Sequence, residues 1–240
     1  MKLRSQQDQW DHLGRTDALW AILTDPDKKK GGWNEGEFFA TGQSEAAELM
    51  ARASVLGLPA ARRTALDFGC GVGRLTQALA GYFDEVTGVD IAPAMLERAR
   101  GYNRHGDRCR YVLNEQTHLR TFPTACFDLV YSRITLQHLP RRFIRTYLAE
   151  FIRVLRPGGL LVFQLPDRCR NWRYWISRGL YRLVMRRFLH RMDVMEMYGI
   201  RRDRVIGLLE GHGARVLGIE EDQAAGPEWL SWRFFAARRD

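Results

Sequence analysis

The sequence predicts an α/β protein built around a parallel sheet. Between about residues 64 and 164, short apolar runs with strand character alternate with segments of helical spacing. Such alternation implies a parallel sheet with right-handed crossovers. A glycine turn follows the first strand-like run, and small polar clusters follow the next ones. Because ligands bind outside the carboxyl ends of parallel strands, we expect these clusters to form one site.

The most informative stretch is Asp67-Phe68-Gly69-Cys70-Gly71-Val72-Gly73, which lies between an apolar run and a helical pattern. Glycine lets a turn adopt positive φ and lets a ligand lie against the backbone. A strand, a glycine turn and a helix N-terminus together form a cofactor cradle, although an isolated glycine turn can also serve only to reverse the chain. The dinucleotide pattern Gly-x-Gly-x-x-Gly fails here, because the third glycine would fall at Arg74.

An acidic residue, Asp90, closes the second strand-like run, Glu85–Val89. A carboxylate at this position can accept hydrogen bonds from both ribose hydroxyls of a nucleoside. Ile91 would offer an apolar face to adenine, and Pro93 fits the first turn of a helix. The alternative is that Asp90 only caps that helix.

Three later clusters follow the same arrangement. Asn114-Glu115-Gln116 comes after the run 110–113, and Ser132 ends a buried strand that begins at Phe127. That strand leads into the segment 133–140. Residues 154–163 predict a helix end, a Pro-Gly-Gly turn and a fifth strand.

The order and spacing of these motifs over about residues 64–164 resemble class I S-adenosylmethionine-dependent methyltransferases. The resemblance implies a Rossmann-like, doubly wound, seven-stranded and mostly parallel sheet with an antiparallel last strand. Residues 214–220 and 229–237 look like its last two strands. It also implies S-adenosylmethionine as the cofactor and S-adenosylhomocysteine as its product.

The resemblance places the acid of the glycine motif near the cationic methionine part of the cofactor, where an acid would favour an ammonium and a sulfonium and repel a pyrophosphate. It places adenine contacts after the third strand, where the family often has Asp and this chain offers three other polar residues. The expected cofactor-binding residues are Asp67, Gly69, Cys70, Gly71, Gly73, Asp90, Ile91, Asn114, Glu115, Gln116 and Ser132.

Composition is consistent with one α/β domain with appendages, since the chain has 240 residues of which 45% are hydrophobic. It contains no apolar segment of the ~18 residues that a membrane span requires, and its start lacks the apolar core of a signal peptide. The four cysteines are far apart, with neither Cys-x-x-Cys nor matched His spacing. This argues against a metal site and against a disulfide framework, and a cytoplasmic location is expected.

We divide the chain into an N-terminal helical cap, residues 1–58, and a cofactor-binding core, residues 59–240. In many small-molecule methyltransferases, N-terminal helices fold over the cofactor and form one wall of the acceptor pocket. Phe38 and Phe39 could then bind the acceptor side near the sulfonium, because aromatic faces attract cations. Equally, they could cover the edge of the sheet.

A helical insertion is expected at residues 166–200, where a lid over the acceptor is common in this fold. Between Arg168 and Arg204 eleven arginines face three acids, which accounts for most of the net charge of +9. The segment could attract an anionic acceptor, lie on a membrane surface, or pack on the domain with a solvated arginine face. Its Met192, Met195, Met197 and Tyr198 could line the acceptor pocket or belong to the core.

Methyl transfer is an in-line displacement, so the protein must position the acceptor and, where necessary, remove a proton. His138 is the best candidate base, although it could instead orient its loop through a backbone hydrogen bond. Arg133 and Gln137 lie at the same predicted mouth and could bind acceptor oxygens.

Three functions are compatible with these residues. The first is methyl transfer to an oxygen or nitrogen of a small molecule such as a sugar, lipid or secondary metabolite. The second is transfer to a peptide, protein or RNA that docks on the basic segment. The third is cofactor binding without turnover. The chain lacks the Asn-Pro-Pro-Tyr type motif of base methylation, which argues against nucleic-acid bases, and the oligomeric state is left open.

Overall fold

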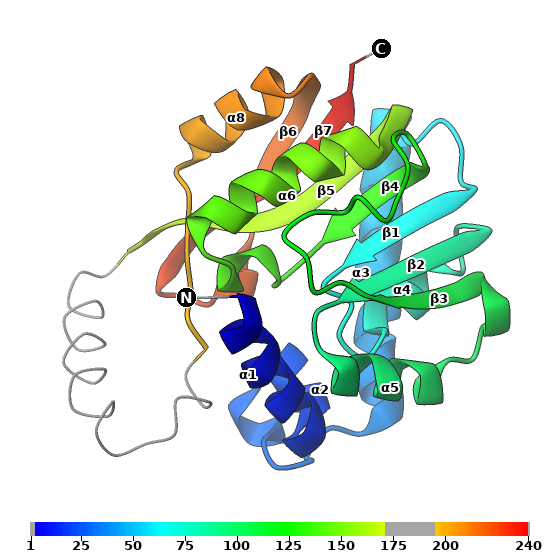
Figure 1. Cartoon of the computed structure of the whole chain (residues 1–240), viewed down its shortest axis with the longest axis vertical. Helices are drawn as coiled ribbons and strands as arrows, with labels where there is room; N and C mark the ends of the chain where they lie inside the picture. The colour runs from blue at the N-terminus through cyan, green and yellow to red at the C-terminus, as the bar shows by residue number, and fades with distance from the viewer. Residues whose placement is uncertain (1–2, 171–194, 240) are drawn as a thin grey trace.

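The computed structural model describes residues 3–170 and 195–239 of the chain (Figure 1). Most of the predicted helical insertion, residues 171–194 with Met192 among them, therefore lies outside the described residues. In chain order the helices and strands are α1 (Leu3–Thr16), α2 (Ala18–Ile22), α3 (Glu35–Leu56), β1 (Thr64–Phe68), α4 (Arg74–Leu79), β2 (Glu85–Asp90), α5 (Pro93–Tyr102), β3 (Cys109–Leu113), β4 (Phe127–Ser132), α6 (Arg141–Val154), β5 (Leu155–Cys169), α8 (Arg202–Gly211), β6 (Ala214–Glu221) and β7 (Trp229–Arg238).

The seven strands form one sheet in the order β3-β2-β1-β4-β5-β7-β6. Strands β1 to β5 run parallel to one another, whereas β7 is antiparallel to both β5 and β6. The predicted fold is therefore confirmed. From β1 the sheet grows in both directions, with β2 and β3 on one side and β4 and β5 on the other. In an open α/β sheet such a change of direction opens a crevice at the carboxyl ends of the strands.

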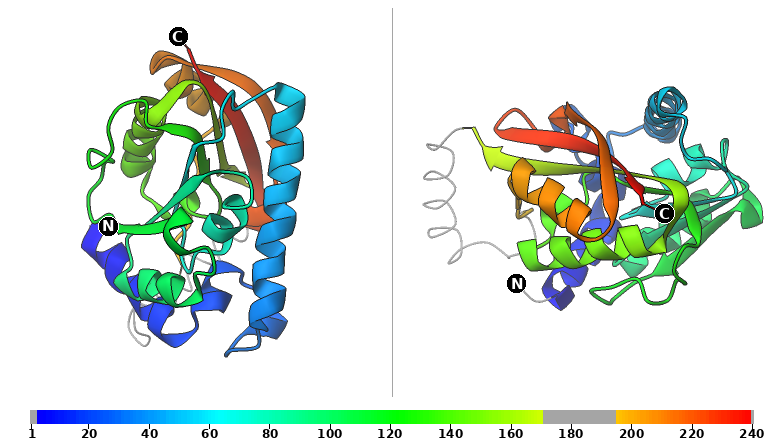
Figure 2. Two further views of the ribbon diagram at one scale, coloured as in Figure 1. Left: turned by 90° about the vertical axis from the view of Figure 1, so that its right-hand side faces the viewer. Right: turned by 90° about the horizontal axis from the view of Figure 1, so that it is seen from above.

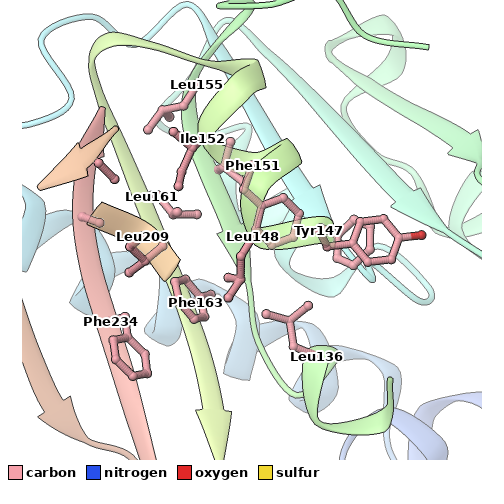
Figure 3. Packing of buried hydrophobic residues seen from close by; sticks show 14 of the residues in the cluster. Leu136, Tyr147, Leu148, Phe151, Ile152, Leu155, Leu161, Phe163, Leu209 and Phe234 are labelled. Atoms are coloured by element: carbon pink, nitrogen blue, oxygen red, sulfur yellow. The ribbon is translucent and has the colours of Figure 1, made fainter. Parts of the chain in front are cut away.

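Helices α6 and α8 cover one face of the sheet. Leu148, Phe151 and Ile152 of α6 pack on β5 and β7, and Leu209 of α8 joins the same cluster (Figure 3). The apolar residues of α6 recur at helical spacing, which gives it one buried face, and the basic side chains lie on the other. This cluster fixes β4 and the turn that follows it.

Helix α3 covers the opposite face, as Figure 2 shows. Its Ala46, Leu49, Met50 and Ala53 pack with β1, β4 and α4. The Asn34 side chain caps the helix start by accepting from the Glu37 N–H, and Gly57 ends it at φ +66°. The predicted boundary at residue 58 thus separates α3 from the sheet that it covers.

Helices α1 and α2 lie at the carboxyl ends of the strands instead (Figure 1). Asp11 of α1 accepts a hydrogen bond from the Ala94 N–H at the start of α5, at 2.7 Å. The Arg98 guanidinium of α5 donates to the Gly14 carbonyl at 2.6 Å. These contacts hold α1 against the edge of the sheet where the site is predicted.

The predicted insertion, 166–200, begins as sheet structure because β5 continues to Cys169 and pairs with β7. After residue 195 the chain returns to β5, where the Ile200 N–H donates to the Pro166 carbonyl at 3.0 Å. Arg141 of α6 also donates to the Gly199 carbonyl at 2.8 Å. Of the helices described, none combines the length and the apolar character that a membrane span needs.

Candidate active site

A cavity lies at the carboxyl ends of β1, β2 and β4 and is covered by α1 and α2. Its empty space, the open mouth included, is about 790 Å³, within the usual range of ligand pockets. The described residues that line it are Gln6, Trp10, Ala21, Ile22, Phe68, Gly69, Gly71, Val89, Asp90, Ile91, Met95, Asn114, Arg133, Ile134, Thr135, His138, Leu139 and Tyr147.

The glycine turn forms one wall. Gly69 and Gly71 both line the cavity and adopt φ of +79° and +52°. A Cβ on Gly69 would lie 2.1 Å from the Thr135 side chain, and one on Gly71 would lie 2.5 Å from Ile22. Neither position therefore accepts a larger residue, because the Thr135 and Ile22 side chains occupy the place of a Cβ and both glycines have positive φ.

Asp67, Cys70 and Gly73 lie behind this wall. Asp67 is buried, and its Oδ2 accepts from the Thr76 hydroxyl at 2.6 Å. Burial raises the pKa of Asp67 to about 7, and it raises the pKa of Cys70 well above its ordinary value. None of the three lines the cavity, so their positions support a role in shaping the turn rather than in ligand contact.

Asp90 does line the cavity. Its two carboxylate oxygens accept from the N–H groups of Gly71 and Ala92, each at 2.9 Å. Burial raises its pKa, although those backbone N–H groups act in the opposite direction. Ala92 is the N-cap residue of α5, and Asp11 binds the Ala94 N–H. Asp90 thus links the glycine turn to the start of α5, and so it does more than cap that helix.

The polar cluster after β3 divides into three different roles. Asn114 lines the cavity, and its amide donates to the Tyr147 hydroxyl at 3.4 Å. Glu115 points toward α1 and accepts from the Gln7 amide at 2.6 Å. The Gln116 carbonyl accepts from the Tyr147 hydroxyl at 2.5 Å. Of the three predicted adenine contacts, Asn114 alone faces the cavity.

The segment after β4 forms the opposite wall. Ser132 is buried and donates to the Phe68 carbonyl at 3.0 Å, so it joins β4 to β1 instead of lining the cavity. Ile134 lines the cavity with φ +57°, a conformation that a β-branched residue rarely adopts. Its N–H donates to Gln164 Oε1 at 3.2 Å. Such strain concentrates at functional sites.

Arg133 joins the cavity to a buried network of charges. Its guanidinium lies 3.3 Å from Glu45 of α3 and 3.5 Å from Asp222. Glu45 also pairs with Arg74 at 2.9 Å, and Asp222 pairs with Arg233 at 2.7 Å. Burial raises the pKa of Glu45, but Arg74 and Arg133 outweigh it, and the pKa lies below its ordinary value.

In this network three guanidinium groups face two carboxylates within the described residues. The Nε of Arg133 is buried and has no hydrogen-bond partner in the part of the chain that the structure describes. Because Arg133 lines the cavity, an anionic group bound beside it would offset the excess positive charge of this network.

His138 lies at the end of a chain of buried hydrogen bonds. Gln164 accepts from the Ile134 N–H, so its amide nitrogen is the group that donates to Gln137 Oε1 at 3.2 Å. Gln137 Nε2 then lies 3.2 Å from His138 Nε2, and His138 Nδ1 lies 3.0 Å from the Glu196 carbonyl. A carbonyl only accepts, so the chain is consistent with the proton on Nδ1 and with Nε2 as an acceptor.

Four of the five predicted acceptor residues, Phe38, Phe39, Gln137 and Tyr198, do not line the cavity. Phe38 is fully buried between Trp33 and Phe39, and Phe39 packs on Tyr102. These rings form the apolar cluster below α2, which corrects the expectation that they lie at the sulfonium. The Tyr198 N–H donates to the Gln137 carbonyl at 2.7 Å, so both residues anchor the returning segment.

Several cavity residues were missed by the sequence analysis. Gln6 and Trp10 come from α1, Ile22 from α2, Met95 from α5 and Tyr147 from α6. No motif marks them, because each belongs to an ordinary amphipathic pattern. The expectation that N-terminal helices cover the site was the only signal that pointed to the first three.

Residues 66–163 match the family model of a methyltransferase domain. A trans-aconitate 2-methyltransferase of Methylobacterium radiotolerans is 39% identical over 137 residues, which are 56% of this chain and 48% of that protein. A 24-methylenesterol C-methyltransferase 2 of Oryza sativa is 31% identical over 70% of this chain and 45% of its own length.

Among solved structures, magnesium protoporphyrin IX methyltransferase from Synechocystis with bound SAH superposes with a TM-score of 0.67 at 17% identity. The match covers 98% of this chain and 99% of that one. The chain spans about half the length of the two curated relatives above.

The strand order, the glycine turn and the acid after β2 define a Rossmann-like protein with a nucleoside-cofactor site. The match over residues 66–163 is to a methyltransferase domain, and the fold is shared with solved methyltransferases that hold S-adenosylmethionine or S-adenosylhomocysteine as the bound cofactor.

The residues present fit that cofactor. Two glycines form part of the cavity wall, and the Asp90 carboxylate lies at the end of β2. Ile91 and Met95 supply apolar surface beside it, and Asn114 supplies an amide after β3. The cavity therefore offers groups of the kind that a ribose, an adenine and an amino-acid tail require.

Proposed function

We propose that this protein transfers a methyl group from S-adenosylmethionine to an oxygen or nitrogen of a small molecule. The observation that carries the proposal is the covered cavity, in which the cofactor residues and the polar groups of Arg133 and Gln6 line a single space under α1 and α2. A space covered by helices favours an acceptor of limited size over a folded macromolecule.

In this proposal the cofactor site is formed by Gly69, Gly71, Asp90, Ile91 and Asn114. Asp90 accepts hydrogen bonds from the ribose hydroxyls, and the two glycines allow the amino-acid tail to approach the backbone. When bound, S-adenosylmethionine supplies a methyl group on a sulfonium, which is electrophilic. The protein's own contribution is to hold the acceptor in line with that methyl and to exclude water.

For the acceptor, we propose that Arg133 binds an anionic oxygen and that Gln6 binds a hydrogen-bond donor. Gln6 is 1% exposed, and its Nε2 donates to the His138 carbonyl. Its Oε1 is thus fixed as an acceptor, and it has no partner within the described residues. The names of the relatives, a trans-aconitate and a sterol methyltransferase, support a small-molecule acceptor.

His138 is proposed to position the wall rather than to act as the base. Both of its ring nitrogens already face hydrogen-bond partners, Gln137 and the Glu196 carbonyl. An acceptor that reaches the site already ionised would need no base. The ring lies edge-on to Trp10 of α1, with centroids 5.1 Å apart, so His138 also connects the wall to the helices above it.

Transfer to a macromolecule that docks on residues 168–204 is the second candidate. The described part of that segment keeps exposed arginines, including Arg168, Arg170 and Arg204, which is the observation in its favour. Salt-sensitive binding of RNA would support it. Contact with a membrane surface and the cytoplasmic location also stay predictions.

A screen with labelled S-adenosylmethionine against pools of small acids, phenols and amines tests the proposal. We expect label to appear in a small product together with S-adenosylhomocysteine. Label found only in protein or RNA, with no small product from any pool, would contradict it.

Once a product is known, Gln6→Leu is expected to lower kcat/KM for the acceptor about tenfold, because one buried hydrogen bond is lost, with affinity for S-adenosylhomocysteine unchanged. Gln7→Leu is the matched control, since Gln7 is its neighbour on α1 and binds Glu115 outside the cavity. A fall in cofactor affinity in Gln6→Leu would instead place Gln6 on the cofactor.

A further inference from the structure

A second hollow lies between α3, α4 and the segment after α5, separate from the cavity described above. Its empty space, the open mouth included, is about 390 Å³. Its described lining residues are Phe39, Gln43, Arg74, Gln77, Ala78, Tyr102, Arg104 and His105. This set contains no acidic side chain.

Two buried hydrogen-bond donors that line this hollow have no partner within the described residues. Arg74 is 4% exposed, and its terminal nitrogens bind Glu45 at 2.9 Å and Thr41 at 3.3 Å, which leaves Nε–H. Gln77 is 7% exposed, and its Oε1 accepts from the Arg104 N–H at 3.0 Å, which leaves Nε2. The amide orientation of Gln77 is fixed by that bond, because a backbone N–H only donates.

The two residues also lie on one helix and line the same hollow. Arg74 and Gln77 are three residues apart on α4, and residues at this spacing lie on the same face of a helix. Unpaired donors in one buried place are rare in native proteins and point to a bound partner. The partner that both can share is a group with at least two acceptor oxygens.

The charges around the hollow favour an anion. Arg104 lies at the rim of the hollow and forms an ion pair with Glu35. Because the two side chains are 76% and 43% exposed, solvent weakens this ion pair. Arg74 belongs to the network in which three guanidinium groups face two carboxylates. The carboxylates of that network, Glu45 and Asp222, do not line the hollow.

We propose that this hollow is a binding site for an oxyanion, either inorganic phosphate or the phosphate or carboxylate group of a metabolite. The oxyanion accepts from Arg74 Nε–H and Gln77 Nε2–H, with Arg104 at the entrance. The site follows directly from the glycine turn, since Arg74 is the residue after Gly73. It does not depend on the proposed methyl transfer.

Calorimetric titration of the full chain with sodium phosphate, and separately with sodium acetate, tests the proposal at low ionic strength. We expect saturable binding of one phosphate per chain. The variant Gln77→Glu keeps the bond to the Arg104 N–H and places a carboxylate against the anion, and it should weaken binding at least tenfold. Arg104→Ala should weaken it several-fold, and it alters an exposed side chain that does not threaten folding.

The control is Arg110→Ala, which removes an exposed arginine outside the hollow and should leave the affinity unchanged. Acetate binding as tightly as phosphate would assign the site to carboxylates, and preference for phosphate would assign it to phosphates. No saturable binding of either anion, or equal affinity in all variants, would overturn the proposal, since water alone would then fill the hollow.

Discussion

Two acids predicted to bind the cofactor turn out to be in different surroundings. Asp90 lines the cavity, whereas Asp67 lies behind the glycine turn and binds the Thr76 hydroxyl. The spacing of strand ends predicted Asp90 and Asn114 because such positions follow from topology. The pattern does not determine which way a side chain at the end of β1 points, since β1 is buried on both faces.

The buried carboxyl of Asp67 makes the unfolding free energy depend on pH. Its pKa rises from 3.8 to about 7 on folding, so the folded state binds the proton more tightly. The protonated Asp67 therefore contributes roughly 4 kcal/mol at most to the unfolding free energy. This contribution is fully present below pH ~4 and is lost as the pH rises through ~7. Urea unfolding at pH 5 and at pH 8 measures the effect. Between these two pH values, the unfolding free energy of Asp67→Asn should fall by less than that of the native chain.

The Asn variant keeps an oxygen that can accept from Thr76, so it isolates the charge. Asp84→Asn, at an exposed position, serves as the control and should follow the native curve. Parallel pH curves for the native chain and Asp67→Asn would show that Asp67 does not titrate in this range.

At the level of elements, the contact between α3 and α4 is unusually close. A Cβ on Gly42 would lie 2.6 Å from the Arg74 carbonyl, and this backbone atom cannot move away cheaply. We expect Gly42→Ala to lower the unfolding free energy by about 1–3 kcal/mol, although alanine favours helices. Gly101→Ala on α5 meets no atom within 4 Å and should be neutral or stabilising.

Thermal or urea unfolding of both variants measures this difference. If Gly42→Ala were as stable as Gly101→Ala, α3 would not be held against α4 as described. It would then belong with a separable cap, as the predicted boundary at residue 58 implies.

The turn that carries His138 is a second element with a testable role. If His138 only positions the wall, His138→Gln should lower kcat less than tenfold and leave the shape of the pH profile unchanged. A catalytic base would cost about 10²-fold or more and would remove one limb of the profile. Steady-state kinetics with the product found in the screen distinguishes the two.

Elements were easier to predict than their contacts. Periodicity and turn residues indicated the strands and the helices of the core. Phe38 and Phe39 were harder, because an aromatic pair at the start of a helix can face a ligand or a core. Only the packing of α2 and α5 around them decides that Phe38 is buried and Phe39 partly buried.

For the whole molecule, the central feature is that segments far apart in the sequence enclose one cavity. The strand ends supply the proposed cofactor residues, and α1 and α2 supply the cover (Figure 1). The strand ends were predictable because the fold dictates them. The cover was predictable only as a region, since the side chains that reach the cavity depend on how α1 packs on α5.

Calorimetric titration with S-adenosylhomocysteine is the measurement that tests this account most directly. The native chain and the control Asp84→Asn should bind with equal affinity, and Asp90→Asn should bind at least tenfold more weakly, because charge-assisted hydrogen bonds to the ribose are lost. Equal affinity in Asp90→Asn, or no binding to the native chain, would contradict the assignment of this cavity as the cofactor site.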